Sequence, residues 1–247
     1  MKYERTTTKN AAGLFQVKAL KDISRYGVKA GDLGGWVASE KNLAQEGDCW
    51  VFGNARVFGN ARVFDDAQVS GNAWVHGDAW VHGDAQVSGN ARVFGNARVF
   101  DDAQVSGNAR VFDDAWVHGD AQVSGNAWVH GDAWVYGNAR VFGDAWVYGN
   151  ARVFGDAWVY GNARVFGDAR IQKTADVLTC SPVGRHLRTL TCFPCEDGVH
   201  RVTAGCFIGT LADLDAKSCS EHASQPAARA QYVAAIAFFR AMSEARK

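Results

Sequence analysis

Four histidines are the side chains in this sequence best suited to proton transfer near neutral pH. Each directly follows a valine, at a position that other copies of the same six-residue phrase fill with Phe, Tyr or Ser; they are His76, His82, His118 and His130. General acid–base catalysis needs a positioned group in a site that excludes water. The array has no insertion between residues 47 and 172 from which such a site could be built. We therefore name the four histidines as candidates and assign no catalytic residue.

A Cys-x-x-Cys pair near the C-terminus has the spacing of half a zinc site. The pair is Cys192 and Cys195, in the run CFPC. A structural zinc site takes four ligands, and no second pair follows at a matching spacing. We interpret the pair as small buried thiols in a compact domain and expect neither a metal nor a cofactor.

Tryptophan is the strongest candidate for a binding surface. Of the eight tryptophans that stand before the valine of the repeated phrase, where other copies have Arg or Gln, the seven after the first hexad are the candidates: Trp74, Trp80, Trp116, Trp128, Trp134, Trp146 and Trp158. Stacked Arg and Trp form exposed cation–π pairs worth about 0.5–1 kcal/mol each. Because so many exposed rings exceed what a monomer normally leaves in water, and because Trp, Tyr and Arg dominate interfaces, we predict that these seven residues form a binding surface.

The repeated phrase itself predicts the architecture that carries these side chains. From Gly47 to Gln172 the chain consists of twenty-one unbroken hexads, nearly all reading Gly/Asp–Asn/Asp–Ala–x–Val–x. Ala and Val lie two residues apart, so a strand points both to one face and points the other two residues outward. Gly-Asn and Gly-Asp suit corners, since Gly readily takes positive φ. The pattern predicts a solenoid that buries Ala and Val coil against coil.

The copies that read Gln-Val-Ser predict the length of one coil. They begin at Gln68, Gln86, Gln104 and Gln122, eighteen residues apart. Three hexads would therefore close a triangular coil, with these glutamines stacked on one face. The same spacing predicts an Asp ladder along one edge, at Asp48, Asp66, Asp84, Asp102 and Asp120, and an Asn ladder along the next, at Asn54, Asn72, Asn90, Asn108 and Asn126. About seven coils at the roughly 4.8 Å strand spacing give a rod about 35 Å long.

The flanking segments are expected to cap the open strand edges at the two ends of the rod. We expect an N-terminal cap over residues 1–46, the solenoid over 47–178, and a small α+β domain over 179–247. In the last of these we predict a hairpin of two strands, at 185–193 and 200–208.

A helix is predicted over 226–246, because Pro226 suits a first turn. Tyr232, Ile236, Phe239 and Met242 would form its apolar stripe.

The hexads resemble those of the hexapeptide-repeat superfamily, whose fold is a left-handed parallel β-helix. The opening KALKDISRYGVKAGDLGGWVASEKNLAQEGDCWVF is similar to uncharacterised acetyltransferase-like proteins of enterobacteria and their phages. The tail, with SPVG, RTLT, GVHRVTAGCFIGTLADL and YVAAIAFF, is similar to a C-terminal module of phage and prophage proteins. The resemblance implies left-handed coiling, a phage or prophage origin and, as one possible activity, acyl transfer from acyl-CoA at a site between subunits.

Composition narrows the range of partners. The chain has 26 basic and 26 acidic side chains, and residues 47–172 carry nine basic and fourteen acidic ones, a net charge of −5. Nucleic-acid binding rewards dense positive charge, so we expect no nucleic-acid partner. There is no N-terminal signal, no apolar run of about 20 residues and no disulfide framework, so we expect a cytoplasmic protein without a membrane partner.

These observations predict an all-β solenoid with a small α+β cap domain and a non-enzymatic structural or binding role. The outward Trp, Arg, Phe and Tyr side chains would join copies of the chain into a homo-oligomer. Two alternatives stay open: an acyltransferase with an inter-subunit site, and a module that binds carbohydrate or a host protein.

Overall fold

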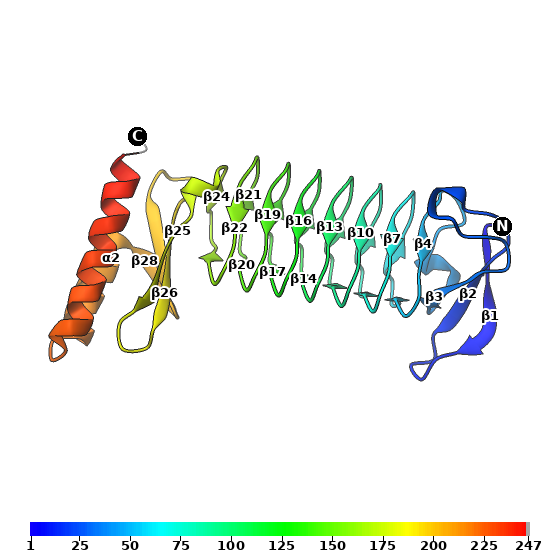
Figure 1. Cartoon of the computed structure of the whole chain (residues 1–247), viewed down its shortest axis with the longest axis horizontal. Coiled ribbons are helices and arrows are strands. Elements are labelled where there is room, and N and C mark those ends of the chain that lie inside the picture. The colour runs from blue at the N-terminus through cyan, green and yellow to red at the C-terminus, as the bar shows by residue number, and fades with distance from the viewer. Residues whose placement is uncertain (246–247) are drawn as a thin grey trace.

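The computed structural model describes residues 1–245 and has the form of a long rod (Figure 1). Its middle is a stack of coils, each made of three two-residue strands separated by turns. Strands of successive coils pair in parallel and form three sheets that run along the rod. This is the β-solenoid that the hexads predict.

The three sheets are the three sides of the rod, and we name them by their outward side chains. The glutamine face consists of β4 (Trp50–Val51), β7 (Gln68–Val69), β10 (Gln86–Val87), β13 (Gln104–Val105), β16 (Gln122–Val123), β19 (Arg140–Val141) and β22 (Trp158–Val159). The first Arg–Trp face consists of β5 (Arg56–Val57), β8 (Trp74–Val75), β11 (Arg92–Val93), β14 (Arg110–Val111), β17 (Trp128–Val129), β20 (Trp146–Val147) and β23 (Arg164–Val165). The second Arg–Trp face consists of β6 (Arg62–Val63), β9 (Trp80–Val81), β12 (Arg98–Val99), β15 (Trp116–Val117), β18 (Trp134–Val135), β21 (Arg152–Val153) and β24 (Arg170–Ile171).

The predicted coil of eighteen residues is confirmed by the strand register. Gln86 pairs with Gln68 on one side and with Gln104 on the other. The backbone N–H of Gln86 donates to the carbonyl oxygen of Ala103 in the next coil, at 2.9 Å. Backbone hydrogen bonds therefore run along the rod, while each short strand is followed by a corner.

The interior of the solenoid is built from alanine and valine alone over most of its length. From Ala55 to Val165 every Ala and Val of the hexads is at most 1 % exposed. The predicted Asn ladder is also present, with the side-chain amide of Asn90 donating to Asn108 at 3.0 Å and that of Asn72 donating to Asn90 at 3.2 Å. Since the inward side chains are identical from coil to coil, each coil fits the next without local adjustment.

The N-terminal cap joins the solenoid earlier than the hexads begin. Its elements are β1 (Tyr3–Lys9), β2 (Phe15–Ala19), η1 (Ser24–Tyr26), β3 (Leu33–Val37) and η2 (Glu40–Asn42). Strand β2 pairs antiparallel with both β1 and β3, but β3 pairs in parallel with β5 and places Val37 beside Val57. Gly34 is needed in β3, because a Cβ there would lie 2.6 Å from the carbonyl oxygen of Val51.

Two buried side chains close the first coil from within. The Nζ of Lys2, whose side chain is fully buried, donates to the carbonyl oxygens of Glu46, Gly47 and Cys49 at 3.2, 3.2 and 2.9 Å. The hydroxyl of Tyr3 donates to the carbonyl of Leu43 at 2.6 Å. Backbone groups that have no preceding coil to bond with are thus satisfied by side chains.

The C-terminal cap is a four-stranded antiparallel sheet covered by two helices (Figure 1). After η3 (Thr174–Asp176) come β25 (Leu178–Val183), β26 (Arg188–Pro194), β27 (His200–Ala204), β28 (Phe207–Thr210), α1 (Leu211–Glu221) and α2 (Pro226–Glu244). The predicted hairpin is present as β26 and β27, but the sheet has two further strands and α1 was not predicted. No helix within residues 1–245 combines the length and apolarity that crossing a bilayer requires.

The sheet of this cap is two-sided, because residues of β26 alternate between two cores. Leu190 and Cys192 pack with the helices, together with the predicted stripe residues Tyr232, Ile236 and Phe239. Phe193 faces the other way, into the solenoid core, with its ring edge-on to Phe166 at 5.4 Å. Thr191 on that side accepts a hydrogen bond from the N–H of Arg164 at 3.1 Å, so a side chain replaces the missing next coil.

Inward and outward positions of one strand should differ sharply in their contribution to stability. We expect Val105→Ala to lower the free energy of unfolding by about 2 kcal/mol, since it removes buried methyl groups and leaves a cavity. Gln104→Ala, one residue away on the outer surface, should change it by less than about 0.5 kcal/mol. Urea unfolding followed by circular dichroism measures both values, and equal losses would contradict the packing described above.

Candidate binding surface

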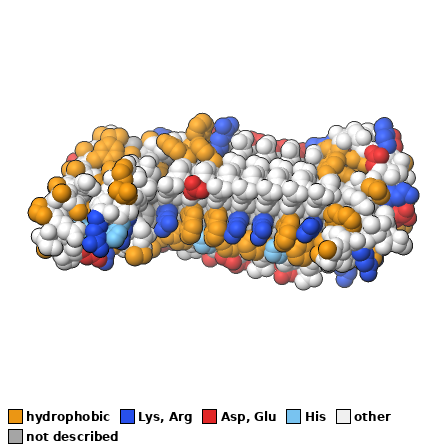
Figure 2. Space-filling model, turned by 60° about the horizontal axis from the view of Figure 1, so that its bottom comes forward, with side chains coloured by type: hydrophobic (Ala, Val, Ile, Leu, Met, Phe, Trp, Pro, Cys, Tyr) orange, Lys and Arg blue, Asp and Glu red, His pale blue; other side chains and the backbone are white. Residues whose placement is uncertain are grey.

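The seven candidate tryptophans lie outside the core, and the structure divides them among the faces. Trp74, Trp128 and Trp146 lie on the first Arg–Trp face, Trp80, Trp116 and Trp134 on the second, and Trp158 on the glutamine face. Basic and hydrophobic side chains are interspersed in one row along the rod (Figure 2). The structure thus brings six of the seven together in two rows.

Within each row the rings and guanidinium groups stack on one another. The Cζ of Arg92 lies 4.8 Å from the ring centroid of Trp74, and that of Arg110 lies 4.7 Å from Trp128. Trp128 in turn stacks on Trp146 with centroids 4.9 Å apart. Because the flat faces of the rings are used inside the row, the ring edges and the guanidinium edges are what the surface offers to a partner.

The four candidate histidines lie in two further ring stacks, which follow the valines of the two Arg–Trp faces. His118 is held between Phe100 and Tyr136, with centroids 4.7 and 5.2 Å away. His82 stacks between Phe64 and Phe100 in the same column. The other column holds His76 and His130 between phenylalanine and tyrosine rings.

Burial lowers the pKa of all four histidines, so the neutral ring is the favoured form. The neutral form of the ring is suited to packing between other aromatic rings in these stacks.

Three of these histidines have an aspartate as neighbour, which sequence reasoning missed. Asp65, Asp101 and Asp113 take the corner position that is elsewhere glycine, with φ of 56°, 58° and 59°. The Nδ1 atoms of His82, His118 and His130 lie 3.7, 3.7 and 3.8 Å from their carboxylates. A signal was available, since each Asp at the glycine position is followed seventeen residues later by His. That offset of seventeen is one residue less than the eighteen residues of a coil.

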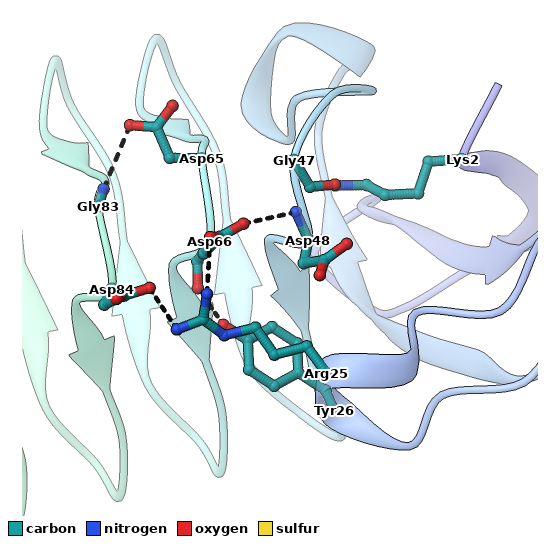
Figure 3. Close-up of polar contacts among 9 residues, drawn as sticks. All are labelled: Lys2, Arg25, Tyr26, Gly47, Asp48, Asp65, Asp66, Gly83 and Asp84. Atoms are coloured by element: carbon teal, nitrogen blue, oxygen red, sulfur yellow. Dashed lines mark hydrogen bonds and ion pairs between the residues drawn. The ribbon is translucent and has the colours of Figure 1, made fainter.

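The corner between the second Arg–Trp face and the glutamine face is the acidic edge of the rod. It carries Asp48, Asp65, Asp66, Asp84, Asp101, Asp102, Asp120 and Asp156. The N-terminal cap offsets part of the negative charge in its first coils, because Arg25 contacts Asp66 at 2.7 Å and Asp84 at 2.5 Å (Figure 3). The hydroxyl of Tyr26 donates to the backbone carbonyl of Asp66. Farther along, Asp102 and Asp120 form none of the ion pairs found within residues 1–245.

The two cysteines of the CFPC run lie in different cores. Cys192 packs with the helices of the C-terminal cap, whereas Cys195 packs at the end of the solenoid core. Within residues 1–245 no three His, Cys, Asp or Glu side chains are placed to hold one metal ion. Burial raises the pKa of the Cys195 thiol, as expected for a thiol in an apolar setting.

The stacked histidines predict a stability that falls with acid. Because the folded-state pKa of His118 lies below its ordinary value of 6.5, its contribution is complete above that value and is lost as pH falls through the folded-state pKa. We expect the unfolding temperature to fall between pH 7.5 and 5, by about 2–4 °C for each kcal/mol lost. His118→Phe, which copies Phe100 of the same stack, should reduce this fall, while His186→Gln, at an exposed site, should leave it unchanged. Equal pH dependence in all three proteins would contradict the role of the stack.

Among known proteins, a described repeat is similar to the hexads of this chain. The model of the YdcK β-solenoid repeat matches residues 67–83, 85–101, 103–119, 121–137, 133–149, 145–161 and 157–173. The matched segments start eighteen residues apart as far as residue 121 and twelve apart after it, where the outward residues begin to alternate with a period of twelve. No curated protein matches the chain. The middle of this chain is therefore similar to the YdcK β-solenoid repeat, and the relationship to hexapeptide-repeat proteins of phages stays a prediction.

Proposed function

We propose that this chain is a non-enzymatic rod that binds a second copy of itself side by side, with the first Arg–Trp face of one rod against the acidic edge of the other. The observation that carries the proposal is the pair of continuous Arg and Trp rows along two of the three sides. In the first row the guanidinium groups of Arg92 and Arg110 lie 4.8 and 4.7 Å from tryptophan rings. Arg and Trp are enriched among the residues that dominate binding energy at protein interfaces.

The capped ends favour association along the sides of the rod. Strand edges at both ends are covered, by β3 with Lys2 at one end and by β26 with its threonine hydroxyl at the other. Uncovered edges would let rods add end to end. With the ends closed, the long faces are the surfaces on which a second copy has room to dock.

The distribution of charge supports a second copy as the occupant. The first Arg–Trp face carries Arg56, Arg92, Arg110 and Arg164. In a three-sided rod the acidic edge is the corner opposite this face, since it separates the other two faces. The acidic edge of one rod is therefore complementary to the first Arg–Trp face of a neighbour. Complementary potentials steer association and fix register.

The histidine geometry favours this proposal over acyl transfer. All four candidates are held between stacked rings, and burial lowers the pKa of each. A general base needs reach to a substrate proton in a closed site. The unbroken hexads from 47 to 172 supply no inserted segment that could close such a site around a histidine.

Sedimentation analysis of charge variants tests the proposal. We expect the wild-type chain to associate reversibly and less strongly as salt increases. Arg92→Glu with Arg110→Glu should weaken association at least about tenfold, because charged groups at the interface become repulsive. Lys21→Glu with Lys41→Glu makes the same change in net charge on the N-terminal cap and should leave association unchanged.

A charge exchange then tests the orientation. Asp102→Arg with Asp120→Arg should weaken self-association to a similar degree, and an equal mixture of the two doubly substituted chains should restore a complex. A wild-type chain that stays monomeric at high concentration would refute the proposal. Full association of the Arg92→Glu, Arg110→Glu chain would refute the assigned surface.

A further inference from the structure

A second candidate site lies in the C-terminal cap, far along the chain from the Arg–Trp rows. The turn between β25 and β26 faces the loop between α1 and α2, and together they line a cavity of about 340 Å³. Its lining consists of Arg185, His186, Arg188, Glu221, His222 and Gln225. A second cavity of about 350 Å³ shares Arg185 and Gln225 with the first and extends over Pro226, Ala227 and Ala228.

The lining is dominated by positive charge. Arg185 and Arg188 contribute two guanidinium groups, and the single carboxylate, that of Glu221, is already paired with Lys217 at 2.9 Å. The pKa of Glu221 is lowered, first by its hydrogen bond with Lys217 and further by the charges of Arg188 and His222. A carboxylate whose charged form is stabilised in this way indicates a positive electrostatic potential around it.

The second cavity lies at the N-terminus of the long helix α2. The helix starts at Pro226, and the side chain of Gln225, the capping residue, makes no capping hydrogen bond. The first N–H groups of a helix have no partner within the helix, and the helix dipole places positive partial charge at that end. The backbone N–H groups of Ala227 and Ala228 are of this kind, and both residues line the cavity.

An independent observation indicates that the first of these two cavities receives a ligand. His222 lines that first cavity, yet the residue is only 8 % exposed and its Nδ1 has no hydrogen-bond partner within residues 1–245. The imidazole is held in place by stacking on Tyr232, with ring centroids 5.2 Å apart. A buried polar atom without a partner costs free energy, and a bound hydrogen-bonding group would remove that cost.

We infer that this junction binds the phosphate group of a small molecule, held by Arg185, Arg188, His222 and the N-terminus of α2. Guanidinium groups form charge-assisted bonds with phosphate oxygens, and helix N-termini bind phosphate through backbone N–H groups. Several donors converge from two segments, which suits a tetrahedral group with several oxygens better than a planar carboxylate. The adjoining cavity, which is lined by the apolar side chains of Pro226, Ala227 and Ala228, would hold the uncharged part of the bound phosphate compound.

Titration of the isotope-labelled full chain with inorganic phosphate, followed by NMR at constant ionic strength and pH 7, tests this site. The backbone signals of Ala227 and Ala228 and the ring signals of His222 should shift together along one saturable curve. Acetate, the carboxylate probe, should act at least about tenfold more weakly. Equal responses to acetate and phosphate would overturn the assignment to phosphate, and the absence of a saturable shift would overturn the site.

Matched variants identify the residues responsible. Arg185→Gln should weaken phosphate binding about tenfold, the effect of losing one charge-assisted hydrogen bond, while Arg240→Gln, exposed elsewhere on α2, should leave it unchanged. Ala228→Glu gives a second route, because a carboxylate in the first turn favours the helix and repels the anion. Circular dichroism confirms folding of each variant. Unchanged affinity in both Arg185→Gln and Ala228→Glu would refute the inferred contacts.

Discussion

The narrow interior of the coil is the constraint on which the structure depends. Each side of the triangle contributes one Ala and one Val to nearly every coil, and these side chains are buried along the rod. Every coil must therefore repeat its predecessor, so that carbonyl and N–H groups meet at about 2.9 Å from coil to coil. Glycine at most corners has φ between 55° and 73°, and a Cβ at Gly107 would approach Gly125 of the next coil to 3.0 Å. Core, corner and backbone bonding thus impose the same eighteen-residue period.

This period also orders the surface. Outward positions stack at the same spacing as the strands, so Arg, Trp, Phe and His necessarily form columns. Columns of identical polar groups pair with themselves, as the Asn amides do, while an Arg and a Trp in neighbouring coils attract each other. The flat faces of most aromatic side chains are consequently used in stacking within the rows. A partner would therefore meet a regular row of ring edges and guanidinium edges. A rod with such rows on two sides and an acidic edge opposite one of them is suited to side-by-side association.

The sequence predicted this part of the molecule well, because periodicity is a local signal that many copies reinforce. Stacking of Gln68, Gln86 and Gln104 follows from spacing alone. The caps carry no such repetition. Helix α1 and strand β25 were missed, and a turn divides the strand predicted at 200–208 into β27 and β28, since single short segments are weakly specified by pattern. The clamp of Arg25 on Asp66 and Asp84 depends on where a loop folds back over the solenoid, and the approach of Arg185 to His222 depends on tertiary packing of segments about 40 residues apart.

Cysteine cross-linking measures the coil length most directly. In a chain whose exposed Cys206 and Cys219 are replaced by Ser, Gln86→Cys with Gln104→Cys places two thiols on adjacent parallel strands. Strands about 4.8 Å apart allow a disulfide, whose Cα atoms usually lie 4.4–6.8 Å from each other. Gln86→Cys with Arg92→Cys, one hexad apart and on different faces, should not cross-link. Oxidation followed by mass spectrometry of proteolytic fragments should detect the first bond and not the second. Cross-linking of the second pair without the first would contradict the eighteen-residue coil.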